Sequence, residues 1–156
     1  MRETIYRGKR VDNGEWVYGL LCRVVDTYAN IVEKDTEVMY TVLTITVGQS
    51  TGMTDKNGKK IFEGDIVKLF DVAVGEIVQE CGAFGIGCRQ LIDFDYLASE
   101  IAPVTGHNNT PLFCYNDNFV SLWELYWNYN EENDEISVIE VIGNIYDSPE
   151  LMEATK

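Results

Sequence analysis

Residues 38–47 read VMYTVLTITV, a run of β-branched and aromatic side chains that favours an extended strand. Toward the N-terminus, three further segments have the same character: around Ile5, Trp16 to Leu21, and Tyr28 to Val32. Asp12-Asn13-Gly14 separates the first two, and a glycine that can adopt positive φ suits a hairpin turn there. We therefore predict an antiparallel β region over residues 1–48.

Toward the C-terminus, residues 48–67 read GQSTGMTDKNGKKIFEGDIV and are rich in turn-forming residues. Asn57-Gly58 is a turn signal, while Ile61 and Phe62 are candidates for burial. We predict a loop here that leads into a strand over Ile66 to Leu69.

The next segments, Val74 to Val78 and Ala83 to Gly87, are short and interrupted by glycine, as the tightly bent strands of small barrels are. We therefore predict an SH3-like β-barrel region over residues 49–156. It carries an acidic insertion at about residues 71–134, with one short strand near Leu112 to Tyr115. The predicted fold class is mainly β, or β-rich α+β, and the two regions can also pack as a single compact domain.

A short helix is predicted after Ser121, because Ser121 and Glu124 have the spacing of a capping box. Large apolar side chains recur on one face of this helix: Phe119, Leu122, Trp123, Tyr126 and Trp127. Alternation of the same residues in a strand is an open alternative, and so is an exposed aromatic patch in place of core packing. After the acidic turn over residues 131–135, the β-branched segment Ile136 to Ile145 is predicted to form the closing strand, which Pro149 ends.

The net charge of −14 belongs entirely to the second half of the chain. Residues 1–68 hold ten Lys and Arg against ten Asp and Glu, whereas residues 69–156 hold two against sixteen. Such a surface repels phosphate backbones, which argues against direct nucleic-acid binding.

No stretch approaches the ~20 apolar residues that span a bilayer, and the N-terminal segment lacks the apolar run of a secretory signal. We expect a cytoplasmic protein with no membrane partner. Its four cysteines are then expected as free thiols: Cys22, Cys81, Cys88 and Cys114.

The candidate metal and phosphate motifs are incomplete. Asp55-x-Asn57-Gly58 places oxygen ligands as the start of a calcium loop does, but Lys59 and Lys60 stand where further oxygens are needed, so a plain turn is favoured. Cys81 and Cys88 lack the close spacing of a zinc knuckle, and Gly82 to Gly87 lacks the glycine order of a phosphate-binding loop. We expect neither a metal nor a cofactor.

The candidate catalytic residues are few. Glu63 and Asp65 would share one face of a strand and could act as an acid and base pair. Carboxylates at a strand entrance more often pair with cations or accept backbone N–H groups, and Arg2, Arg7 and Lys60 are available partners. His107 is the only histidine, and its nearness to Cys114 in sequence does not establish a pair in space. A non-enzymatic protein is expected, with a small hydrolase-like enzyme using Glu63, Asp65 or Cys114 as a minor alternative.

Three blocks of the sequence carry a resemblance to a known family. They are Arg2 to Arg7 with Trp16 to Gly19, Val47 to Val67, and Glu140 to Leu151. In order and placement, these blocks resemble the phage-associated YopX family, whose members are named without a known activity. The resemblance spans the chain from end to end. It implies a phage or prophage gene working inside a bacterial cell and a β-rich subunit that self-associates, and it implies no catalytic residues.

The favoured hypothesis is a non-enzymatic protein-binding module that forms a homo-oligomer and presents a surface to a phage or host protein. Basic clusters of the first half could dock on the acids of a neighbouring copy: Arg2, Arg7, Lys9 and Arg10, with Lys56, Lys59, Lys60 and Lys68. The alternative is an acidic DNA mimic, in which the carboxylates of the second half occupy a host DNA-binding protein.

The segment from Gln49 to Asp65 is predicted as the interaction surface, because its polar residues exceed what a plain connection needs. These residues are Gln49, Thr51, Asp55, Asn57, Glu63 and Asp65.

Overall fold

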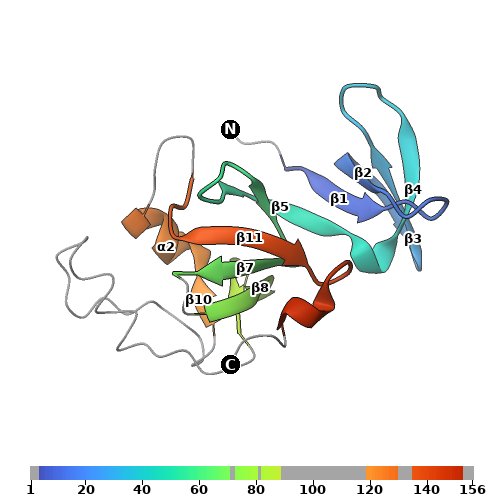
Figure 1. Ribbon diagram of the computed structural model, residues 1–156. Helices are drawn as coiled ribbons and strands as arrows, with labels where there is room; N and C mark the ends of the chain where they lie inside the picture. Colours follow the sequence, from blue (N-terminus) through green and yellow to red (C-terminus); the bar gives the residue numbers. More distant parts are fainter. Residues whose placement is uncertain (1–3, 71–72, 81, 89–118, 130–134, 153–156) are drawn as a thin grey trace.

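Two antiparallel sheets make up most of the computed structural model, which describes residues 4–70, 73–80, 82–88, 119–129 and 135–152 (Figure 1). The first sheet has the strand order β4-β3-β2-β1-β5-β6. Its strands are β1 (Tyr6–Lys9), β2 (Trp16–Val25), β3 (Tyr28–Val32), β4 (Met39–Leu43), β5 (Gly48–Thr54) and β6 (Lys60–Phe62). The prediction of a mainly β fold is therefore confirmed.

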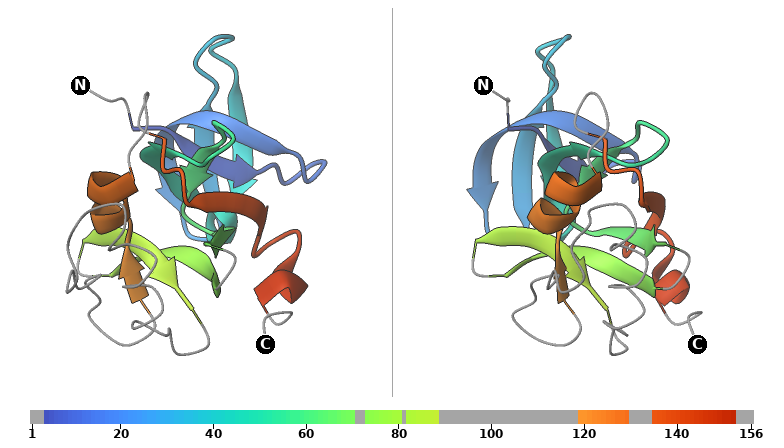
Figure 2. Two further views of the ribbon diagram at one scale, coloured as in Figure 1. Left: turned by 60° about the vertical axis from the view of Figure 1, so that its left-hand side comes forward. Right: turned by 90° about the vertical axis from the view of Figure 1, so that its left-hand side faces the viewer.

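The second sheet has the strand order β10-β9-β8-β7-β11. Its strands are β7 (Asp65–Leu69), β8 (Ala73–Glu80), β9 (Ala83–Gly87), β10 (Phe119–Ser121) and β11 (Ile139–Asn144). An α-helix, α2 (Leu122–Tyr129), follows β10, and two short 3-10 helices, η1 (Thr44–Thr46) and η3 (Pro149–Met152), complete the elements. Figure 2 shows β1 to β4 of the first sheet, in blue to cyan, above the yellow-green strands β8 and β9 of the second.

The first sheet curls so that β4 returns toward β1. Arg10 and Val42 form an isolated bridge, and the Val11 N–H donates to the Thr41 carbonyl at 3.1 Å. The interior of the curl is a small apolar core of Val17, Ala29, Ile31 and Val42. Because side chains alternate along a strand, the neighbours of Ile31 on β3 point to the opposite, outer face.

A larger core lies on the second sheet. It includes Val67, Leu69, Ile77 and Ile86 from the sheet, Ile61 from β6, and Leu122 and Leu125 from α2, all completely buried. The aromatic residues near α2 are divided between core and surface. Phe119 on β10 is buried, whereas Trp123 is half exposed and stacks on Tyr126 with ring centroids 5.6 Å apart.

Two sequence predictions need correction. The strand predicted over residues 38–47 ends at Leu43, because the Thr46 hydroxyl donates to the Leu43 carbonyl at 2.7 Å and turns the chain into η1. The loop predicted over residues 48–67 instead contains β5 and β6, so the first sheet reaches Phe62. Gly48 is a point of close approach, since a Cβ there would lie 2.4 Å from the Glu63 carbonyl oxygen.

Several predicted features lie outside the described residues. They are the strand near Leu112 to Tyr115, His107, Cys81, Cys114 and most of the acidic insertion. Within the described part, Cys22 is an exposed free thiol and Cys88 a buried one. No helix among the described residues has the length and apolar character needed to cross a membrane.

Candidate functional site

A buried ion pair joins the two sheets. Arg7 of β1 and Asp65, the first residue of β7, lie 2.8 Å apart between Nη1 and Oδ1, with side chains only 5% and 2% exposed. The other carboxylate oxygen accepts the Phe62 N–H at 2.7 Å. Burial raises the pKa of Asp65, and the charge of Arg7 and the Phe62 N–H act in the opposite direction.

The chain passes from the first sheet to the second at Glu63-Gly64, directly beside this ion pair. Gly64 has a φ of +92°, a conformation that glycine adopts without steric cost. Arg7 also donates from Nη2 to the Glu63 carbonyl at 3.4 Å. Glu63 therefore lies in a turn, and the shared strand face predicted for Glu63 and Asp65 does not form.

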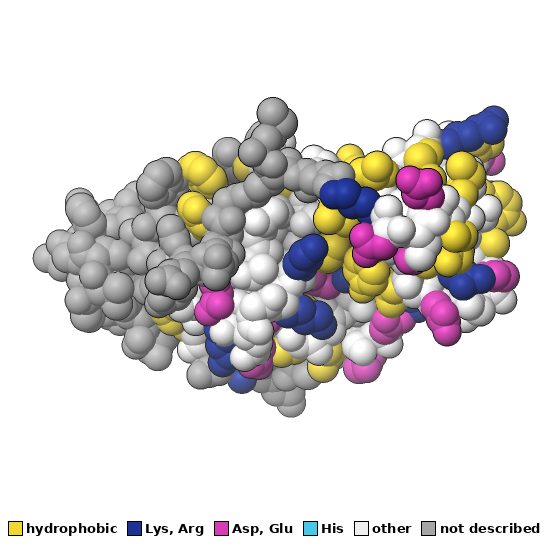
Figure 3. Space-filling view, turned by 90° about the horizontal axis from the view of Figure 1, so that it is seen from above, with side chains coloured by type: hydrophobic (Ala, Val, Ile, Leu, Met, Phe, Trp, Pro, Cys, Tyr) yellow, Lys and Arg dark blue, Asp and Glu magenta, His cyan; other side chains and the backbone are white. Residues whose placement is uncertain are grey.

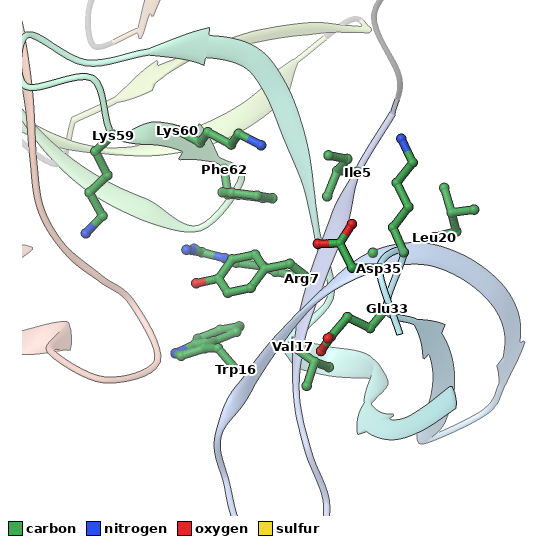
Figure 4. A pocket seen from close by; sticks show the side chains of 13 residues that line it. Ile5, Arg7, Trp16, Val17, Leu20, Glu33, Asp35, Lys59, Lys60 and Phe62 are labelled. Carbon is green, nitrogen blue, oxygen red and sulfur yellow. The ribbon is translucent and has the colours of Figure 1, made fainter. Parts of the chain in front are cut away.

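Aromatic rings enclose the guanidinium of Arg7 on both sides. Its Cζ lies 4.7 Å from the centre of the Trp16 ring and 5.0 Å from that of Phe62. Tyr18 packs against Phe62 with ring centroids 5.4 Å apart. Figure 4 shows Phe62, Arg7 and Trp16 as successive layers of this stack. A cation held between aromatic faces is stabilised by the ring quadrupoles, more strongly where water is excluded.

Trp16 connects the stack to the turn after β11. Its Nε1–H donates to Asp147 Oδ2 at 2.8 Å, and its ring lies 5.8 Å from that of Tyr146. Lys9 forms an ion pair with the same carboxylate. Hydrogen bonds from Lys9, Trp16 and Asn144 lower the pKa of Asp147 to about 2.

This lowered pKa predicts a measurable pH dependence. Because the folded form binds a proton on Asp147 less readily than the unfolded chain, its contribution to stability is complete above about pH 5. That contribution is lost as the pH falls through about 2. The side chain is 41% exposed, so solvent screening reduces the contribution to about 1 kcal/mol. Urea unfolding should show Asp147→Asn less stable than wild type by about that amount near pH 6, with the difference vanishing near pH 2. A difference independent of pH would contradict this account.

A second buried carboxylate, Asp55, ties the turn after β5 to the second sheet. It is 1% exposed, and its Oδ1 accepts the N–H groups of Asn57 and Lys59 at 2.9 and 2.8 Å. Its Oδ2 accepts the Val141 N–H of β11 at 2.9 Å. These bonds agree with the plain turn favoured over a calcium loop.

The six residues predicted as an interaction surface do not form one exposed surface. Asp55 and Asp65 are buried and bonded internally. Thr51 donates to the Ile61 carbonyl at 2.9 Å, and Gln49 accepts the Glu63 N–H on its carbonyl at 2.9 Å, so these residues join β5 to β6 and the following turn. Asn57 is exposed on its turn.

An open groove of about 630 Å³ lies beside the aromatic stack. Trp16, Tyr18 and Phe62 line it together with Leu20. Lys59 and Lys60 lie at one side of it and Glu33 and Asp35 at the other (Figure 4). Arg7 and Lys34 complete its charged lining. This groove was not predicted from the sequence, although Trp16, Tyr18 and Leu20 recur at the two-residue spacing that places side chains on one strand face.

The three blocks that carry the family resemblance meet at this junction. Arg7 and Trp16 come from the first block, Asp55, Phe62 and Asp65 from the second, and Val141, Tyr146 and Asp147 from the third. The most distinctive parts of the sequence therefore hold the two sheets together and form one wall of the groove.

Comparison with known proteins gives a family match and a similarity to solved structures. A family model described as YopX protein matches residues 6–153. The crystal structure of protein EF1440 from Enterococcus faecalis is similar over 97% of this chain and 99% of that chain, at 20% identity and a TM-score of 0.46. No curated protein matches the chain.

Proposed function

The chain belongs to the YopX family, and from this premise we propose that it is a non-enzymatic protein-binding module that self-associates through one face of its first sheet. The observation that carries the proposal is the outer apolar face of β2, β3 and β4. This face consists of Leu20, Val25, Tyr28, Val32, Met39 and Leu43.

The strand register defines this face. Leu20, Val32 and Met39 form one cross-strand row, and Val25, Tyr28 and Leu43 form another. A polar row of Arg23, Asn30 and Thr41 separates them, with the Asn30 amide donating to the Thr41 hydroxyl at 3.2 Å. Both apolar rows point away from the Ile31 core.

Several apolar side chains of this face are exposed to solvent. Tyr28 is 52% exposed, Val25 48% and Met39 59%. Among the described residues, every exposed large hydrophobic side chain except Trp123 lies between residues 11 and 45. Figure 3 shows hydrophobic side chains at the surface of the end formed by the first sheet. Exposed apolar side chains gathered on one sheet face in this way are typical of protein interfaces.

The charge distribution favours the first half of the chain over the second as the contact between two copies. The whole net charge of −14 resides in residues 69–156, so two copies repel one another through their second halves. The first half is neutral, and it carries the apolar face. A face that meets its own equivalent about a two-fold axis needs no other complementary surface.

The ionic, head-to-tail contact predicted from sequence has less support than the apolar contact. Arg7 pairs with Asp65, Lys9 with Asp147, Arg10 with Asp12 and Lys56 with Glu140, all within the chain. Four of the eight basic residues predicted for that contact are thus already neutralised, which favours an apolar contact. The alternative of a DNA mimic rests on carboxylates that mostly lie outside the described residues, and it stays a prediction.

Introducing charged side chains into the apolar face tests the proposal. The variant Tyr28→Lys/Leu43→Lys places two cations in one cross-strand row and should convert an oligomer into a monomer, because burying them against the equivalent row is costly. Light scattering coupled to size-exclusion chromatography measures the mass. The matched control, Trp123→Lys, alters an exposed aromatic residue of α2 and should leave the mass unchanged. A wild-type protein that is monomeric at about 100 μM, or an unchanged mass in the double variant, would overturn the proposal.

A further inference from the structure

We propose that the groove beside Tyr18 binds an extended segment of another protein. This segment carries an aromatic or large aliphatic side chain, with acidic residues on one side of it and a basic residue on the other. The inference rests on the proposed protein-binding function and names the class of partner for a neighbouring surface.

The size and lining of the groove suit a short segment that places a large side chain in it. Its volume of about 630 Å³ lies within the range typical of ligand pockets, roughly 300–1,000 Å³. Tyr18 is 46% exposed and offers apolar surface to a ligand, whereas Leu20 lies where the groove borders the outer apolar face. Phe62 is buried behind them and fixes the Tyr18 ring by direct packing. An aromatic side chain of a partner could stack on Tyr18 with little loss of conformational entropy in the Tyr18 side chain.

The stack beneath the groove makes this wall rigid before a ligand arrives. Arg7 is bound to Asp65 and enclosed by Trp16 and Phe62, and Trp16 is bound to Asp147. Because these side chains are already ordered, a ligand does not have to immobilise them. Such preorganisation lowers the entropic cost of association.

The rim of the groove has cations on one side that are available to a partner. Lys59 and Lys60 are both exposed, and neither forms an ion pair with another residue in the described part of the chain. In contrast, the nearby Lys56 pairs with Glu140. Acidic residues of a partner can therefore meet Lys59 and Lys60 without displacing an existing contact.

The opposite side of the groove carries carboxylates. Glu33 and Asp35 line it there (Figure 4). A nucleic acid, which presents phosphates along its whole length, would meet these carboxylates as well as the lysines. A peptide with acids at one end and a base at the other satisfies both sides. The arrangement therefore favours a peptide of mixed charge over a polyanion.

Fluorescence anisotropy with a defined peptide tests the inference. The probe is a fluorescein-labelled peptide in which two glutamates precede a tryptophan and two lysines follow it. We expect saturable binding to the wild-type protein, and binding about tenfold weaker to Lys59→Glu/Lys60→Glu. Lys56→Glu, an equal change of charge per residue outside the groove, should bind within about twofold of wild type.

A charge-swapped peptide separates direct contact from loss of folding. Replacing the two glutamates of the probe by lysines should weaken binding to wild type and restore binding to Lys59→Glu/Lys60→Glu. Three results would each overturn the inference. They are absence of saturable binding, no restoration by the charge swap, and displacement of the probe by a single-stranded oligonucleotide at a lower concentration than by the unlabelled peptide.

The mass of Lys59→Glu/Lys60→Glu separates this inference from the proposed function. These lysines lie outside the outer apolar face, so the variant should keep the wild-type mass in light scattering. Loss of peptide binding together with the wild-type mass would assign the lysines to the groove alone. A lowered mass would place them in the self-association contact and would overturn the groove as a separate site.

Discussion

Replacing Arg7 by methionine should lower the free energy of unfolding by about 3–5 kcal/mol, because it leaves the buried carboxylate of Asp65 without its counter-charge. Methionine has a similar length and keeps apolar contact with Trp16 and Phe62. The loss therefore reports mainly on the uncompensated charge. Urea unfolding followed by the fluorescence of the tryptophans measures it.

The pH dependence of this variant has a defined sign. Burial raises the pKa of Asp65, and the positive charge of Arg7 partly offsets this effect. Without Arg7, the pKa of Asp65 in the folded protein therefore rises further above its ordinary value. A group whose pKa is raised on folding contributes more stability at low pH. The difference between Arg7→Met and wild type should therefore shrink as the pH falls from about 7 to about 4.

A double variant provides the control. Arg7→Met/Asp65→Asn removes both charges, and the asparagine oxygen can still accept the Phe62 N–H that Asp65 accepts in the native protein. It should recover much of the stability lost in Arg7→Met. If the double variant were no more stable than the single one at neutral pH, the buried charge would not be the cause of the loss.

Replacing Asp55 by alanine is expected to destabilise the protein by about 3 kcal/mol. The change removes the acceptor of three backbone N–H groups, and each buried donor left without a partner costs about 1–3 kcal/mol. The Asn57 and Lys59 donors lie in an exposed turn where water can replace the carboxylate in part. The Val141 donor belongs to β11, so the junction between turn and sheet should loosen most.

Hydrogen exchange can locate this effect. In Asp55→Ala, the amides of Asn57, Lys59 and Val141 should exchange faster than in wild type. The exchange rates of the β3 amides should rise only as much as the lower free energy of global unfolding accounts for. The control Asn57→Ala alters an exposed side chain of the same turn and should cost less than about 0.5 kcal/mol. Equal losses for the two variants would show that the carboxylate of Asp55 does not hold the turn.

The strands of the fold were largely predictable because their signal is local. The segment predicted as a strand over Tyr28 to Val32 is β3, and the segment over Ala83 to Gly87 is β9. β-branching and alternation act within each strand and need no knowledge of its neighbours. Prediction failed over residues 48–67, where Gly48 was interpreted as a turn former. Its actual role is to allow β5 to approach the Glu63 backbone.

The junction was only partly predictable. Arg7 was among the candidate partners of Asp65, but which cation reaches a carboxylate depends on how two sheets pack. The long-range contacts of Asp147 with Trp16 and of Asp55 with Val141 have no signature in spacing or composition. The outer apolar face could not be predicted from the sequence for a related reason. Alternation on β3 shows that two faces differ, but only the curl of the sheet determines which one is exposed.

The central claim is that copies of this protein associate through the outer apolar face. Sedimentation velocity of the unmodified protein from about 1 to 100 μM, at about 0.1 M and about 1 M sodium chloride, tests it most directly. An apolar contact predicts an oligomer whose mass is kept or increased at high salt, since screening weakens both the repulsion between the acidic halves and any ionic attraction. A monomer at every concentration, or an oligomer that dissociates at high salt, would contradict the claim.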